Sequence, residues 1–365
     1  MPSISWELPL NSTSASVVAL PAVQRCIHTI ASDVARCPVV GSDAAGNMVD
    51  DTTISSLFAS QARGDILTGT DFRRWMAAEC LVTGNAFAAI EVDSIGNPVT
   101  LRPLSTADVQ LNQNTDGTLA WTYQGIEFDY GYVLHWKALP TAGNPYWGTS
   151  PLAAVSPTLE ALAQLEAAFY AYAKNGGMGK LAFSHPGALQ PAVRDAMRTA
   201  FMTQHGSAGS AGTPIFVGEG MKVEPISSAA QSELAAARAA GMRTVAAIFG
   251  VPGAYLESSD ARTQPEIAAM YATSLQAWSA SWMSEVSSKL APSGRHVHID
   301  FTPVTQGDFL TAGRAYAQLM QVGALAANDV RRRIGLPPWP GLDEPRPVIS
   351  GVTPVDAQGG NQGNA

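Results

Sequence analysis

The chain has 365 residues, 46% of them hydrophobic, so it can bury a sizeable core, and a wholly disordered protein is excluded. Charged residues make up 14%, below the roughly 25% of an average globular chain, so much of the surface is expected to be covered by contacts between subunits. The net charge of −8 excludes a strongly basic domain that binds DNA tightly through its phosphates.

The first 150 residues predict a mixed α+β unit preceded by an arm. Residues 1–20 are polar and serine-rich and are expected to be flexible. Apolar residues at three- and four-residue steps predict a helix from Pro21 that ends before Pro38, and a second helix is expected over 70–82. Alternating apolar residues then predict a hairpin continued as a meander, with strands over 87–92, 99–104, 109–111, 119–123 and 132–136.

Two long helices with a folded insertion between them are expected next. Ser150 is predicted to be the N-cap of the first helix and Pro151 its first residue, while Pro157 kinks the helix or restarts it after Ser156. The second helix begins at the capping box 228–231 and ends at Gly250. Between them, strands are expected over 181–184, 213–217 and 221–226, a helix over 192–204 and a mobile loop of small residues over 206–212.

The last third predicts one long helix and then shorter elements. The long helix starts at Pro265 and carries its apolar residues on one face. Its apolar residues are Ile267, Tyr271, Leu275, Trp278, Trp282, Val286 and Leu290. A strand over 296–301, a helix from Asp308 and a short helix over 328–334 follow, and the tail after Pro347 is expected to be disordered.

Short motifs in a fixed order indicate a family. The chain resembles the portal proteins of tailed phages, of the Hong Kong 97 type, over roughly residues 20 to 340. The stretches that carry the resemblance are 23–38 (VQRCIHTIASDVARCP), 83–90 (TGNAFAAI), 98–104 (PVTLRPL), 133–137 (VLHWK), 147–152 (WGTSPL), 175–177 (NGG), 245–252 (VAAIFGVP) and 328–338 (NDVRRRIGLPP). Each motif alone is weak, and their shared order makes the match specific.

The resemblance implies an α+β portal fold that forms rings. The parts it implies are a flexible arm (1–20), a wing (21–150), a stem helix (151–175), an α/β clip (176–227), a second stem helix (228–250), a tunnel loop (251–265), a wing return of helix and strand (266–306), a small helical crown (307–335) and a partly disordered C-terminal tail (336–365). Independently of the family, two capped helices around an insertion with its own strands predict a hairpin of two rods bearing a tip.

The resemblance also implies a structural role. About twelve identical subunits would close into a ring at one capsid vertex by head-to-tail contacts. Double-stranded DNA would pass through the ring non-specifically, and the ring would bind the terminase large subunit, the major capsid protein or scaffold and the head-tail connector (adaptor). The implied place is the virion, after synthesis in the host cytoplasm. No catalytic residue, cofactor, metal or membrane is implied.

Two clusters are candidates for contact with DNA. Ser258, Ser259, Asp260, Arg262 and Gln264 in the tunnel loop are short and polar, which suits weak, water-mediated and sequence-independent contact as well as an ordinary surface loop. Arg331, Arg332 and Arg333 would touch DNA at the inner mouth of the channel, or else form a solvated helix end that complements the helix dipole.

Other readings of the sequence find less support. An enzyme would need a motif that is missing: the Gly179-Lys180 pair is followed by Leu181, so there is no P-loop, and no GxSxG occurs. His296 and His298 form a possible metal half-site, but no Cys or HxxE partner lies nearby, so solvent-facing strand alternation is the favoured interpretation. A short connector protein (adaptor), or a portal from a prophage or gene-transfer particle, stays as the alternative.

The three cysteines predict a reduced protein. Cys26, Cys37 and Cys80 lie among apolar neighbours and form no CxxC pair, as is typical of core cysteines in proteins made in a reducing cytoplasm. The sequence contains no run of 18 apolar residues, so no membrane span is predicted.

Overall fold

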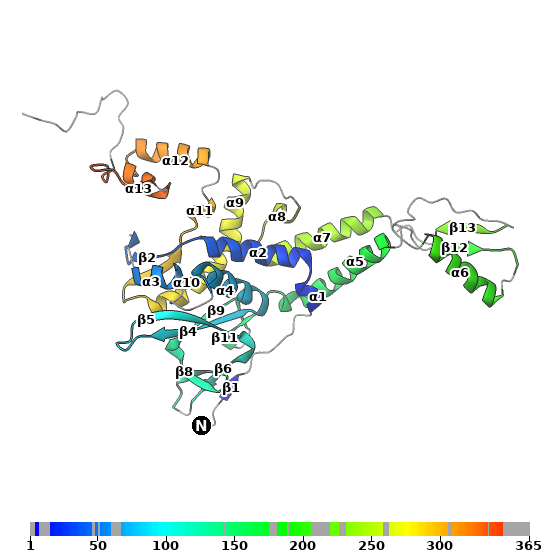
Figure 1. Ribbon diagram of the computed structural model, residues 1–365, viewed down its shortest axis with the longest axis horizontal. Helices are drawn as coiled ribbons and strands as arrows, with labels where there is room; N and C mark the ends of the chain where they lie inside the picture. Colours follow the sequence, from blue (N-terminus) through cyan, green and yellow to red (C-terminus); the bar gives the residue numbers. More distant parts are fainter. Residues whose placement is uncertain are drawn as a thin grey trace, which may run out of the picture. The chain divides into compact units, whose positions relative to one another are not determined.

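The computed structural model describes residues 4–6, 15–45, 48–49, 52–59, 67–114, 116–141, 144–174, 181–187, 190–205, 220–225, 231–257, 263–305, 309–334 and 336–345. The chain divides into two compact units, Met1–Phe301 and Thr302–Ala365. The first unit mixes helices and strands (Figure 1), which confirms the predicted α+β class.

Two packed helices form the base of the first unit. Helix α2 (Pro21–Arg36) and helix α4 (Gly69–Thr83) contact each other, and the predicted apolar stripe of α2 is buried between them and their neighbours. The side chain of Thr68 caps α4 by accepting from the backbone N–H of Asp71 at 3.1 Å. Buried Arg73 of α4 donates to the carbonyl oxygens of Ala35 on α2 and Phe58 on α3 (Thr52–Ala59), so one side chain ties three helices together.

The strands form several small antiparallel sheets. The sheet orders are β1-β6-β7-β8, β5-β4-β9 and β14-β2-β3, with two further pairs, β10-β11 and β12-β13. Their bounds are β1 Ile4–Trp6, β2 Val39–Asp43, β3 Met48–Val49, β4 Asn85–Val92, β5 Pro98–Leu104, β6 Val109–Gln113, β7 Leu119–Tyr123, β8 Ile126–Asp129, β9 Val133–Lys137, β10 Leu139–Thr141, β11 Asn144–Thr149, β12 Leu181–Ser184, β13 Lys222–Pro225 and β14 Arg295–Ile299.

The predicted hairpin is confirmed, but the predicted meander is wrong at its first and last steps. Strand β6 does not continue the hairpin; it pairs with β7 and β1 in a different sheet from β5. Strand β9 does not follow β7; it pairs with β4, and Ala88 lies opposite Leu134. Strand β8, which was not predicted, lies beside β7 instead. The reason is burial: residues 133–136 are all buried, and such a continuous apolar strand requires a sheet that is covered on both faces.

Helix α10 (Gln276–Leu290) covers that sheet. The rings of Trp282 on α10 and Trp136 on β9 stack with their centroids 4.9 Å apart, and the Trp282 indole N–H donates to the Lys137 carbonyl at 3.1 Å. Leu275, Trp282, Val286 and Leu290 are buried, as the predicted apolar face requires. The long helix is, however, divided: α9 (Gln264–Met270) is separated from α10 by a π-helical turn over Tyr271–Leu275, which the apolar spacing did not predict.

The N-terminal segment differs from the predicted flexible arm. Strand β1 pairs with β6, and helix α1 (Ala15–Val18) follows, with Val17 and Leu20 buried. The residues Ile4, Ser5 and Trp6 alternate in polarity as a strand does. Their backbone groups can therefore pair with the open edge of a sheet, even though the segment around them is rich in serine. The predicted core cysteines are confirmed: Cys26, Cys37 and Cys80 are free and buried, and burial raises the pKa of Cys26 and Cys37 to about 12.

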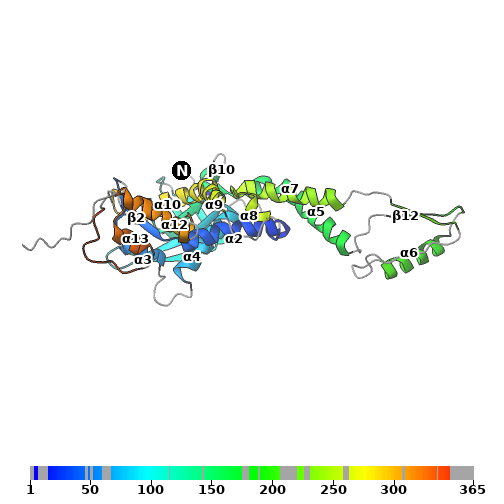
Figure 2. The same cartoon turned by 90° about the horizontal axis from the view of Figure 1, so that it is seen from above.

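The two long helices of the middle region are α5 (Ser156–Lys174) and α7 (Gln231–Phe249). They run side by side in both views (Figures 1 and 2) and contact each other. Helix α6 (Pro191–His205) and the β12-β13 pair make up the insertion, where Phe183 and Phe201 meet edge to face at 5.0 Å. The predicted strand 213–217, the loop 206–212 and the capping box 228–231 up to its last residue lie outside the described residues.

The second unit contains helices α11 (Thr302–Thr305), α12 (Phe309–Gln321) and α13 (Ala327–Arg333). It begins at Thr302, a few residues before the boundary predicted for the crown. Residues 336–345 fold back on α13, because the Asn328 side chain donates to the Trp339 carbonyl at 2.7 Å and to Asp343 at 2.9 Å. The tail from residue 346 lies outside the described residues.

Candidate functional site

A buried amide connects two of the family-like motifs. Asn85, at the start of β4, is fully buried; its Nδ2 donates to the Gly148 carbonyl and its Oδ1 accepts from the Gly148 N–H, each at 2.8 Å. The same Oδ1 lies 2.9 Å from Nε2 of His135, which must donate the hydrogen because the oxygen can only accept. The TGN and WGTSP stretches are therefore held together by one side chain.

Glycine is required at this contact for two reasons. Gly84 has a φ of +88°, the left-handed conformation in which it ends α4. A Cβ added at Gly148 would overlap the carbonyl oxygen of Gly84, and one added at Gly84 would lie 2.5 Å from the backbone nitrogen of Ser150. The two backbones approach too closely for any side chain.

Ser150 links the same junction to the first long helix. Its Oγ donates to the Val82 carbonyl at 2.6 Å and accepts from the backbone N–H groups of Leu152 and Ala153 at 3.2 and 3.3 Å. The hydroxyl thus caps a turn, but the prediction that Ser150 and Pro151 begin the long helix is wrong: a 3₁₀ turn spans Ala153–Val155, and α5 starts at Ser156 with Pro157 in its first turn, which agrees with the predicted restart after Ser156. With both its roles taken by backbone groups, this hydroxyl is a structural cap.

Charged groups from α10 fix the opposite side of the junction. Glu285 Oε1 lies 2.6 Å from Nζ of Lys289 and accepts from the His135 backbone N–H at 3.3 Å. Lys289 also donates to the Val133 carbonyl at 2.7 Å and stands 4.2 Å from the centroid of the Tyr130 ring. The ion pair thus holds α10 on strand β9.

The burial of His135 has a consequence for pH. Desolvation, with Lys137 and Lys289 nearby, holds the pKa of His135 well below its usual value, so the folded protein keeps this imidazole neutral. The unfolded chain binds a proton near pH 6.5. Because the unfolded state gains the proton first, stability is complete above that pH and falls below it, by up to about 1.4 kcal/mol per pH unit.

We therefore expect the melting temperature to fall more steeply between pH 6.5 and 5 in the parent protein than in His135→Gln. Differential scanning calorimetry across that range checks it. His28→Gln, at an exposed position of α2, serves as the control and should keep the steep slope. Equal slopes for the parent and His135→Gln would contradict the neutral buried imidazole.

The two long helices contact each other through an ion pair and through a close approach at a glycine. Glu166 on α5 and Arg238 on α7 form an ion pair of 2.6 Å, and the Arg238 guanidinium also lies 5.4 Å from the centre of the Phe169 ring. Gly241 on α7 faces Leu162, and a Cβ there would overlap that side chain. Much of the remaining surface of both helices is exposed alanine, so the pair presents a smooth and weakly charged face.

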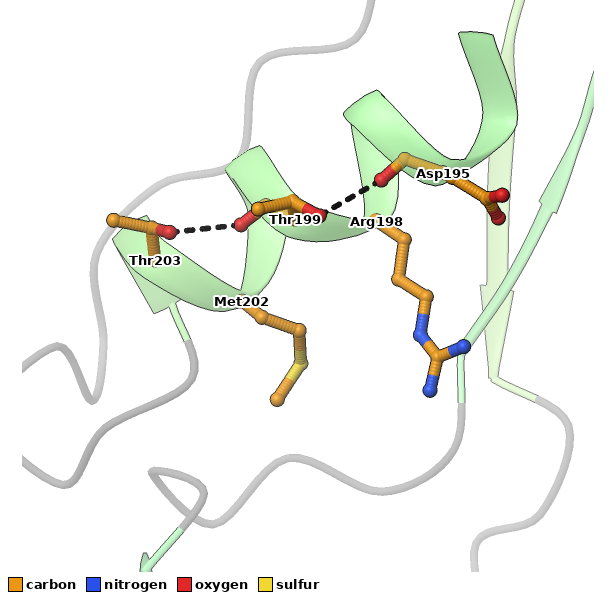
Figure 3. A pocket seen from close by; sticks show the side chains of 5 residues that line it. All are labelled: Asp195, Arg198, Thr199, Met202 and Thr203. Atoms are coloured by element: carbon orange, nitrogen blue, oxygen red, sulfur yellow. Dashed lines mark hydrogen bonds between the residues drawn. The ribbon is translucent and has the colours of Figure 1, made fainter. Parts of the chain in front are cut away.

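A hollow on the insertion is lined by one face of α6 (Figure 3). Its lining residues are Asp195, Arg198, Thr199, Met202 and Thr203. The hydroxyls of Thr199 and Thr203 donate to carbonyls of their own helix at 2.9 Å, which leaves them no hydrogen to donate elsewhere. Its described lining residues combine charged with apolar side chains, as a surface that contacts another protein does.

Only one of the five predicted tunnel-loop residues lies among the described residues. Ser258, Ser259, Asp260 and Arg262 lie outside the described residues, and Gln264 begins α9. The segment leading into them is fixed: Val251 and Tyr255, next to and within the short helix α8 (Ala254–Glu257), are buried.

The three predicted crown arginines have different surroundings within the second unit. Arg331 donates to the Pro337 carbonyl at 2.8 Å, and its guanidinium lies 5.0 Å from the centre of the Trp339 ring. Arg332 pairs with Asp329 at 3.1 Å and Asp343 at 2.9 Å. Arg333 is exposed and has no ion pair with a described residue. Two of the three cations therefore serve the fold of this unit.

The two histidines considered as a metal half-site lie on one strand. On β14 the side chain of Val297 is buried, while His296 is exposed and His298 half-buried, as strand alternation requires. Within the part of the chain that the structure describes, no three His, Cys, Asp or Glu side chains gather to hold a metal ion. In the same part, no helix is long and apolar enough to cross a membrane.

A family model matches most of the chain: the model of the family described as "Phage portal protein" matches residues 21–335. No curated protein matches the chain.

Solved structures share the fold. A chain in the neck of an empty gene transfer agent (GTA) particle, computed with C6 symmetry, has a TM-score of 0.59 and 21% identity, with 91% of this chain and 94% of that chain covered. An HK97 family phage portal protein from Corynebacterium diphtheriae has a TM-score of 0.59 and 17% identity, covering 80% and 96%. A chain in the neck of a native GTA particle, computed with C12 symmetry, has a TM-score of 0.59 and 20% identity, covering 92% and 96%.

Proposed function

Since this chain belongs to the phage portal protein family, we propose that it forms a closed ring of about twelve subunits at one capsid vertex and that double-stranded DNA passes through the ring. The C12 symmetry of the native GTA neck, which contains a chain of the same fold, supports this stoichiometry. A closed ring needs the same two surfaces on every subunit, and the low charge of the chain agrees with large covered surfaces.

The observation that carries the proposal is the pair α5 and α7 with the insertion between them. Among the described residues of this pair, the alanines of both helices are mostly exposed, which leaves surface for neighbours and for the channel. The exposed alanines and the net charge of −8 suit a wall that DNA slides past, because cations that would trap phosphates are few. In this role the chain is a passive conduit and performs no chemical step.

The insertion is the proposed binding site for the packaging motor. Helix α6 exposes Val193, Met197 and Met202 together with Arg194, Asp195 and Arg198, a mixture that suits contact with a protein. We assign the terminase large subunit to this surface during packaging and the head-tail connector afterwards. The major capsid protein or scaffold would contact the wing, and the assembled ring would lie in the virion.

Two alternatives to this proposal are a portal from another kind of particle and a different component of the same particle. A portal of a prophage or gene-transfer particle is favoured specifically by the two GTA neck structures that share this fold. An adaptor is less well supported, since the chain covers nearly the full length of the HK97 family portal chain. Of the predicted DNA contacts, Arg333 is the arginine of the crown that we assign to DNA, because Arg331 and Arg332 are paired within their own unit.

The proposed role of the tunnel loop can be tested by shortening it. Deleting residues 258–262 is expected to leave rings intact and to reduce strongly the DNA that particles retain, because the loop tip is then too short to contact the duplex. The DNA content of purified particles measures this, with an equally long deletion at 61–65 as the control. Normal DNA retention in rings that lack 258–262 would contradict the assignment.

A further inference from the structure

Hydrogen bonds from the backbone and from side chains reach several carbonyl groups at the end of helix α7. Gly250 has a φ of +67°, its N–H donates to the Ala247 carbonyl at 3.1 Å, and the N–H of Val251 donates to the Ala246 carbonyl at 2.8 Å. This pair of bonds is a Schellman motif, which satisfies two of the last carbonyls of the helix. Further along the chain, the carbonyls of Phe249 and Gly250 accept hydrogen bonds from side chains.

Three side chains from the distant long helix reach those two carbonyls. Ser274 Oγ donates to the Phe249 carbonyl at 2.9 Å, and the indole N–H of Trp278 donates to the same oxygen at 3.2 Å. Thr273 Oγ1 lies 2.6 Å from the Gly250 carbonyl and 2.7 Å from the Ala269 carbonyl, so its one hydrogen is held between two acceptors. Ser274 is fully buried, which makes its hydrogen bond costly to lose.

The π-helical turn over Tyr271–Leu275 is what brings these donors together. Adjacent side chains of an α-helix point about 100° apart, yet Thr273 and Ser274 both reach the end of α7. A Cβ on Gly250 would lie 2.5 Å from the Thr273 carbonyl oxygen, so backbone meets backbone here. π-helical turns within α-helices are frequent at functional sites.

We propose that Thr273, Ser274 and Trp278 are positioning residues: they fix the point at which the chain leaves α7, so that the loop to residue 263 starts from a rigid base. The proposal rests on the proposed function, in which that loop faces DNA. Where the chain leaves α7, the side chains of Val251 and Tyr255 are buried. Where the chain enters α9, the Glu266 side chain accepts a hydrogen bond from the Thr263 backbone N–H at 2.8 Å and caps that helix. The described residues on both sides of 258–262 are thereby held in place.

Thr273→Val and Ser274→Ala, singly and together, test the proposal in purified rings. Hydrogen exchange is measured at the amides of Val251, Tyr255 and Leu256, whose N–H groups bond within the base of the loop. Loss of each donor is expected to speed exchange there about fivefold to tenfold while ring mass is unchanged. Trp278→Phe, which removes only the indole N–H, gives a milder third variant should the double variant not fold.

The chain offers matched controls. Thr273→Ser keeps the hydroxyl and should exchange at the parent rate. Thr244→Val makes the same change at an exposed hydroxyl of α7 that donates to the Ala240 carbonyl at 3.1 Å, and should change exchange at the loop base less than twofold. Unchanged exchange in Ser274→Ala and Thr273→Val would overturn the anchor.

The DNA retained by particles separates this inference from the function on which it rests. Faster exchange with reduced DNA retention supports both. If exchange rises while retention stays normal, the positioning role toward DNA is overturned, whereas the deletion of 258–262 decides independently whether the loop serves DNA at all.

Discussion

Replacing Asn85 with alanine is expected to lower the free energy of unfolding by about 3 to 5 kcal/mol, because three buried polar groups lose their partner together. These groups are the N–H and the carbonyl of Gly148 and Nε2–H of His135. The junction is buried and packed by aromatic rings: the His135 ring stacks on Phe87 with the ring centroids 4.2 Å apart. Chemical denaturation of an unassembled subunit, or of rings at fixed concentration, measures the loss.

Asn112→Ala is the matched control for this prediction. Asn112 lies half-buried on β6, and its Nδ2 donates to Thr122 Oγ1 at 2.7 Å. Alanine at this position therefore removes one hydrogen bond between side chains and leaves no buried backbone group without that partner. The expected loss is about 1 kcal/mol. A similar loss for the two variants would contradict the view that the Asn85 amide holds the junction.

Replacing residues 181–225 with a short flexible linker is expected to abolish DNA packaging while the rest of the subunit still folds. The insertion has its own contacts, the β12-β13 pairing and the packing of Phe183, Phe201 and His205, so its removal leaves the other cores intact. The expected failure follows from the proposal that the motor binds the surface of α6, which this variant lacks. Pull-down of the terminase large subunit and the DNA content of particles measure the two steps.

A milder variant separates docking from folding. Arg198→Glu on α6 reverses one exposed charge in the hollow of Figure 3 and should weaken the pull-down without changing the fold of the insertion. Arg25→Glu makes the same change on the exposed side of α2 and should leave docking unaffected. Undisturbed docking in the linker variant would require the motor to bind elsewhere.

The sequence predicted those elements whose signal is local. The helix over Pro21–Arg36, the Ser150 cap and the Gly250 stop each follow from spacing or capping chemistry within a few residues. The partner of β9 could not be predicted in this way, because pairing with β4 depends on which sheet is covered by α10. Strand β1 was missed for a similar reason: an edge strand depends on the sheet it joins.

The candidate site was predictable only in part. The motifs with Gly84 and Gly148 were visible, but their meeting through Asn85 joins residues 63 positions apart and leaves no periodic signal. The π-helical turn was hidden because its apolar residues keep a helical spacing. One available signal was overlooked: Thr273 and Ser274 lie among the residues of the predicted apolar face, and Trp278 on that face carries an indole N–H, so all three bring donors that need acceptors when buried.

The central claim, that the chain closes into a ring, is tested most directly by the mass of the purified protein in light scattering together with negative-stain images of the same peak. The claim predicts a particle with a central hole and a mass of twelve times the 38.2 kDa subunit, about 458 kDa, or a nearby ring stoichiometry. Some rings close only beside their capsid protein, so the chain is also co-expressed with it. A chain that stays monomeric or dimeric under both conditions would contradict the portal assignment.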